Sequence, residues 1–140
     1  MTAWKIASIV VLTAANAFFV AAEFGLVTVR RTRVKELVAE GNRRAVSTQK
    51  AISQLSLMLS GTQLGVTLTA LGMGAVGEPA LADGLRSALD FLPSAVHSIA
   101  THAVASVIAF VIITFFDVVI GEMVPKNLAL TRPEGIALAV

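Results

Sequence analysis

Three acidic side chains lie within or beside long apolar stretches of this 140-residue chain: Glu23, Asp117 and Glu122. Ionisable groups in such surroundings are costly to bury, so they usually have a function. Asn16 lies seven residues before Glu23, and a neighbouring apolar stretch carries further polar side chains at Thr62, Gln63, Thr67 and Thr69. Oxygen donors without sulfur or imidazole suit a hard cation such as Mg²⁺, Na⁺ or Ca²⁺.

The sharpest local pattern is Gly121-Glu122-Met123-Val124-Pro125-Lys126. Pro125 disfavours helix at Val124, and Gly121 loosens the backbone just before it. We therefore expect the helix to break here and to free backbone carbonyls beside the Glu122 carboxylate. A carboxylate next to freed carbonyls can bind a cation, as in transporters with discontinuous helices.

The elements that must position these groups are predicted from composition. The chain is 56% hydrophobic and only 14% charged, whereas about a quarter of the residues in a soluble domain are charged. Three apolar runs, at about residues 6–27, 55–76 and 98–120, have the length of roughly 20 residues that crosses a bilayer as a helix. Isolated spans must pair their own backbone groups, so we predict an all-α integral membrane protein with three transmembrane helices.

Charge sets the expected orientation of these spans. Residues 28–53 carry seven Lys or Arg against two Glu, whereas residues 77–96 carry three acids and one Arg. Because basic loops stay in the cytoplasm, we predict an outer N-terminus, a cytoplasmic helix over 28–53, an outer loop over 77–96 and a cytoplasmic C-terminus. Gly41-Asn42 should break the basic helix, and Gly77-Glu78-Pro79 should form a turn.

Several functions are excluded or disfavoured. The chain has no cysteine and two histidines, so thiolate sites and three-histidine metal sites are absent. No nucleophile is paired with a base and no Gly-rich phosphate loop occurs, so we expect no enzyme. The bases lack aromatic partners, so nucleic-acid binding is not indicated. Gly61 and Gly65 form a GxxxG pattern, typical of close helix packing or dimerisation.

The order of short motifs along the chain carries a resemblance to a known family. The motifs are Asn16–Glu23, Glu40–Asn42, Gly61–Leu68, Gly77–Leu81 and Gly121–Leu128. Together they resemble the N-terminal transmembrane domain of the CNNM/CorC magnesium transporters, also called the HlyC/CorC or hemolysin-like family. The resemblance covers nearly the whole chain.

The resemblance implies an architecture and an activity. It implies a dimer in the inner (plasma) membrane, formed with an identical subunit or a related one, with a juxtamembrane belt helix that begins near Ile136. A CBS pair and a C-terminal domain are expected downstream of this chain. The implied activity is export of Mg²⁺, often coupled to Na⁺, with ATP bound only by the CBS pair.

On this basis we predict the ion ligands. Glu122 is the charged ligand and Gly121 offers a carbonyl, while Glu23, Thr67 and Asp117 are second-rank ligands or coupling-ion groups. Lys126 closes the site or marks the cytoplasmic face, and Glu23 alternatively pairs with Arg30 or Arg31.

A second interpretation stays open. Where the family carries a serine and two asparagines, this chain reads Val20-Ala21-Ala22 and Gly65–Ala70. The chain would then be a non-conducting membrane scaffold that binds a related subunit or a larger membrane complex.

Overall fold

The computed structural model describes residues 3–89 and 99–140 as a bundle of helices. The elements are α1 (Ala3–Thr28), α2 (Arg31–Ala39), α3 (Arg43–Ser53), α4 (Leu55–Leu89), α5 (Ile99–Phe116), the π-helix η2 (Asp117–Met123), α6 (Val124–Thr131) and α7 (Pro133–Ala137). Every element within these ranges is helical, which confirms the predicted all-α class.

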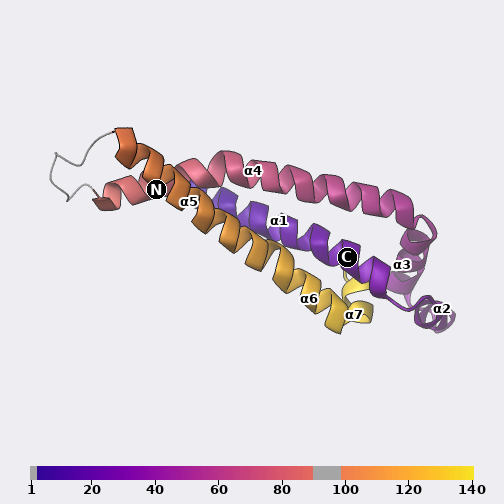
Figure 1. Ribbon diagram of the computed structural model, residues 1–140. Coiled ribbons are helices and arrows are strands. Elements are labelled where there is room, and N and C mark those ends of the chain that lie inside the picture. Colours follow the sequence, from indigo (N-terminus) through magenta and orange to yellow (C-terminus); the bar gives the residue numbers. More distant parts are fainter. Residues whose placement is uncertain (1–2, 90–98) are drawn as a thin grey trace.

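Three helical segments are long and apolar enough to cross a membrane: Ala3–Thr28, Leu55–Leu85 and Ser106–Thr131. The third combines the end of α5 with η2 and α6, and it extends further toward the C-terminus than the predicted span over 98–120. Figure 1 shows α1 between α4 and the α5–η2–α6 column, with α2, α3 and α7 gathered at one end. Large apolar side chains such as Val11, Leu64 and Val107 remain exposed, as expected of surfaces that face lipid.

Small residues let α4 approach its neighbours closely. A Cβ atom added to Gly65 would lie 2.6 Å from the ring of Phe19 on α1, and one added to Gly72 would lie 3.1 Å from Leu12. Gly61 has open space around its Cα. Of the GxxxG pair, therefore, Gly65 serves packing within this chain and Gly61 does not.

The turn predicted at Gly77-Glu78-Pro79 is wrong, because α4 runs through it to Leu89. Ala80 and Ala82 are buried, and a Cβ on Gly77 would come 3.0 Å from Ile113 of α5. The free energy gained by packing this small-residue surface outweighs the cost of the helical hydrogen bond that Pro79 cannot donate. Residues 90–96 of the predicted outer loop lie outside the described residues.

The basic segment forms a helical hairpin that breaks where predicted. Gly41 adopts φ +83°, a left-handed conformation that glycine tolerates best. The Asn42 side chain then caps α3 by accepting hydrogen bonds from the backbone N–H groups of Arg44 (3.0 Å) and Ala45 (3.3 Å).

An apolar core joins this hairpin to the ends of α1 and α7. It contains Leu26, Val29, Val34, Leu37, Ala45, Ile52 and Ala137. The buried Thr48 hydroxyl donates to the Ala137 carbonyl at 2.9 Å. The hairpin and the C-terminal turn are therefore one packed unit at the basic end of the bundle.

The contrast between the two glycines of the GxxxG pair gives a first test. We expect Gly65→Ala to destabilise the bundle by about 1–3 kcal/mol relative to Gly61→Ala, because only the first new methyl overlaps an aromatic ring. Both changes gain the same helix propensity, so their difference isolates packing. Reversible unfolding in mixed micelles measures it, and equal stability of the two variants would contradict the α1–α4 contact.

Candidate functional site

A polar cluster joins all three candidate spans. Asn16 of α1 is 4% exposed. Its Oδ1 accepts a hydrogen bond from the Thr69 hydroxyl of α4 at 3.0 Å, and its Nδ2 donates to Oδ1 of Asp117 on η2 at 3.3 Å. The Asn16 amide is therefore the bridge between α4 and the third span.

The three members of this cluster lie near the middle of their respective spans. Asn16 and Thr69 are buried and Asp117 is half-buried. A polar group that no partner satisfies at this depth of a membrane costs several kcal/mol. Mutual hydrogen bonding removes much of this cost for Asn16 and Thr69. Asp117 uses only Oδ1 for the recorded bond, and within residues 3–89 and 99–140 no protein partner is recorded for its Oδ2.

We predicted that the helix would break at Val124, but it does not break there. It widens into a π-helical segment instead, in which the Val124 N–H donates to the Val119 carbonyl five residues earlier. Val124 has helical angles of φ −63° and ψ −53°, and Pro125 lies buried in the first turn of α6. The widened turn accommodates a proline without ending the helix, and such π segments are frequent at functional sites.

Gly121 brings the backbone of η2 against the cluster. A Cβ atom at this position would lie 2.8 Å from Asp117 Oδ1 and 2.9 Å from Asn16 Nδ2. Any side chain here would therefore displace one of these two groups. Pro125 has no N–H, so it cannot donate the usual helical bond to the Gly121 carbonyl four residues earlier.

The structure brings together Asp117 and Gly121, two of the five predicted ligands. Glu122 is exposed on η2, and Glu23 is half-buried on α1. Among the described residues, Glu23 has no ion pair with Arg30 or Arg31. The described part of the chain also holds no group of three His, Cys, Asp or Glu side chains that could bind a metal ion.

Thr67 lies outside the cluster. It is exposed, and its hydroxyl donates to the Gln63 carbonyl of its own helix at 2.9 Å. Thr69 occupies the buried position instead. Residues two apart on a helix of 3.6 residues per turn point to nearly opposite faces, so one of this pair faces α1 and the other does not.

Lys126 does not join the cluster either. Its ammonium group lies over the Phe24 ring, 4.7 Å from the ring centroid. A cation over an aromatic face is a favourable contact. In this structure the contact links α6 to α1.

From the sequence we named Asn16 and Thr69 among the polar side chains of the spans but did not include them among the five predicted ligands. The available signal was their position, since each polar side chain lies near the centre of its span. Choosing Thr69 over Thr67 requires knowing which face of α4 meets α1. In the structure this face is marked by Gly65 and Gly72, which pack against Phe19 and Leu12 of α1.

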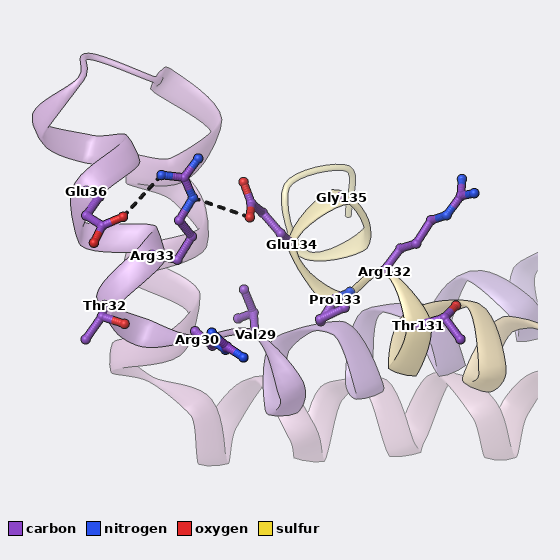
Figure 2. A pocket seen from close by; sticks show the side chains of 10 residues that line it. All are labelled: Val29, Arg30, Thr32, Arg33, Glu36, Thr131, Arg132, Pro133, Glu134 and Gly135. Carbon is purple, nitrogen blue, oxygen red and sulfur yellow. Dashed lines mark hydrogen bonds and ion pairs between the residues drawn. The ribbon is translucent and has the colours of Figure 1, made fainter.

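A hollow at the basic end is organised by Arg33 (Figure 2). Its guanidinium pairs with Glu36 at 3.1 Å within α2 and with Glu134 of α7 at 3.4 Å. The hydrogen bond that Arg33 donates to the Glu36 carboxylate, followed by the charge of Glu134, raises the pKa of Arg33 above its ordinary value. Arg33 thus ties the hairpin to α7.

Comparison with known proteins finds a family model and several relatives that match nearly the whole chain. A family model described as the cyclin M transmembrane N-terminal domain matches residues 7–140. UPF0053 protein YhdT of Bacillus subtilis is 43% identical over 130 residues, covering 93% of this chain and 28% of the relative. UPF0053 protein YrkA of the same organism is 41% identical over 138 residues, covering 99% of this chain and 31% of the relative.

An uncharacterized protein of Mycobacterium tuberculosis is 43% identical over 127 residues, covering 91% of this chain and 35% of the relative. The chain thus spans about a third of the length of the curated relatives it matches. No solved structure matches the chain.

The bond between Asn16 and Thr69 can be measured by a double-mutant cycle. We expect Asn16→Ala and Thr69→Val to be coupled by about 0.6 kcal/mol in the free energy of unfolding, and by no more than about 1.7 kcal/mol, the mean and the maximum found for hydrogen bonds between membrane helices. Thr67→Val is the matched control, because Thr67 also bonds a carbonyl of its own helix but does not reach Asn16. Equal coupling for both threonines would contradict the cluster.

Proposed function

This chain belongs to the family of cyclin M transmembrane N-terminal domains, and from that premise we propose that it is the membrane domain of a gradient-driven divalent-cation transporter. In this proposal Mg²⁺ is exported and Na⁺ moves the other way. The protein acts as a dimer in the plasma membrane.

The cluster of Asn16, Thr69 and Asp117 is the observation that carries this proposal. It offers carboxylate, amide and hydroxyl oxygens from three different spans, near the middle of each. These are the donor types that Mg²⁺ and Na⁺ accept, and Mg²⁺ keeps several of its own waters when one or two carboxylates bind it. A site at mid-depth formed by a locally altered helix is also the arrangement that secondary transporters use.

We assign each member of the site a role. Asp117 supplies the charge through its second carboxylate oxygen, and Asn16 and Thr69 orient that carboxylate or exchange their mutual bond for the ion. The Gly121 carbonyl is a further donor. Glu122 is exposed on the same π segment. We assign it the role of receiving or releasing the ion at the exposed surface of the three-helix bundle.

The coupling ion has separate candidate ligands. Glu23 and Thr67 lie outside the cluster and remain the proposed groups for Na⁺. A CBS pair that binds ATP remains a proposal for the part of the protein outside this chain. Movement of α7 would reach the hairpin through Arg33 and the apolar core at the basic end.

The second candidate function is a non-conducting membrane scaffold. The observation in its favour is that the Asn16 amide already has protein partners for both its oxygen and its nitrogen. A cluster whose purpose is only to hold three helices in register would look the same at these two atoms. Within the described ranges no protein group bonds the second oxygen of the half-buried Asp117. This oxygen favours transport, because a carboxylate without a role is costly inside a membrane span.

A flux measurement separates the two candidates. We expect the full-length protein in proteoliposomes to move Mg²⁺ in response to a Na⁺ gradient, and Asp117→Asn to lower that flux by at least about tenfold, since loss of ligand-shell groups typically costs that much or more. Glu122→Gln should also lower it.

Asp83→Asn is the matched acid-to-amide control, because Asp83 pairs with Lys5 at the opposite end of α1 from the hairpin. Its flux should stay at the wild-type level. If the folded wild-type protein moves no Mg²⁺, with or without a Na⁺ gradient, transport is rejected and the scaffold function is favoured.

A further inference from the structure

A second hollow lies between α2 and α3, with a volume of about 530 Å³. Its lining combines three basic, three aliphatic and two neutral polar side chains and contains no acid: Arg31, Lys35, Lys50, Val34, Val46, Ile52, Gln49 and Ser53. We call it the hairpin groove. The groove therefore carries positive charge, and no acidic side chain of its lining neutralises it.

The bases of the hairpin groove have no protein partner in the described part of the chain. Among the described residues, the ion pairs formed by bases involve Lys5 and Arg33. The hydrogen bonds donated by Lys or Arg side chains there involve the same two residues, and not Arg31, Lys35 or Lys50. The neighbouring hollow differs, because Arg33 is already held there by Glu36 and Glu134 (Figure 2). An anionic ligand therefore has more to gain in the hairpin groove.

The aliphatic part of the hairpin groove indicates an amphipathic ligand. Val34 is 1% exposed and Ile52 is 7% exposed, so both belong to the core beneath the groove, whereas Val46 is 52% exposed. A free inorganic anion would leave Val46 in contact with water. A ligand with an anionic group beside a hydrocarbon portion would satisfy the bases and cover the valine together.

The position of the hairpin groove along the chain sets its depth. Its first wall, α2, begins at Arg31, directly after α1 ends at Thr28, and its second wall, α3, ends at Ser53, directly before α4 starts at Leu55. Both walls are therefore attached to the same ends of two candidate spans. Groups at the end of a membrane span lie at the level of the lipid headgroups.

We propose that the hairpin groove binds one anionic glycerophospholipid. Arg31, Lys35 and Lys50 hold the phosphate headgroup, and Val46 packs against the hydrocarbon next to it. Basic pockets beside membrane helices bind such headgroups. The lipid would fix the hairpin, and with it α7, to the membrane surface.

Native mass spectrometry of the delipidated full-length protein tests this proposal. Phosphatidylglycerol and phosphatidylcholine with identical acyl chains are titrated separately. We expect phosphatidylglycerol to bind preferentially and the variant R31Q/K35Q/K50Q to lose affinity for it by about 10- to 100-fold, because each base near a membrane surface contributes substantially to anionic lipid binding. Val46→Glu, which adds one acid to the groove, should weaken binding in the same direction.

The matched control is R30Q/R43Q/R44Q, which removes three bases from the same segment without touching the groove lining. It should keep the preference for phosphatidylglycerol. Equal loss in both triple variants, or no preference between the two lipids in the wild type, would overturn the proposal. Complete displacement of phosphatidylglycerol by inorganic phosphate would overturn it too, since the site would then recognise the free anion. Val46→Glu decides the matter if the first triple variant does not fold.

Discussion

An amide buried halfway through a membrane helix must find its hydrogen bonds inside the protein, and Asn16 finds them on both other spans. Its oxygen receives the Thr69 hydroxyl and its nitrogen reaches the Asp117 carboxylate. Because water is absent at that depth, losing either bond costs more than it would at a protein surface. The rotation of all three spans about their axes follows from this requirement, and so does the choice of residues that face inward.

Glycine provides the space that this arrangement needs. Gly65 admits the Phe19 ring between α1 and α4, and Gly121 lets the third span approach until its backbone meets the cluster. The π-helical turn that contains Gly121 ends at Met123, two residues before the buried Pro125. Together these features form a helix that continues across the bundle while its hydrogen-bond pattern changes beside a carboxylate. Such π-helical segments are frequent at functional sites.

Much of this architecture could be predicted from the sequence, because long apolar runs and clustered bases report directly on a bilayer. The break at Gly41 and the cap at Asn42 were equally accessible, since both depend on local chemistry. Both prolines led to wrong predictions, because local rules favour a turn or break at Pro79 and Pro125. Packing among helices retains the helix at Pro79, and the π-helical turn accommodates Pro125. We predicted Thr67 as a ligand where the structure has Thr69 in the cluster, because periodicity alone does not reveal which face of α4 meets α1.

We propose that Asp117, oriented by Asn16, forms a cation site near the middle of the spans. Anomalous diffraction from crystals of the protein soaked in Mn²⁺ tests it most directly, since Mn²⁺ accepts the same octahedral oxygen ligands as Mg²⁺ and is visible by its own signal. We expect an anomalous peak about 2.0–2.2 Å from an Asp117 carboxylate oxygen. A peak only at other acids, with the bond between Asn16 and Asp117 intact and no metal beside it, would contradict a cation site at Asp117.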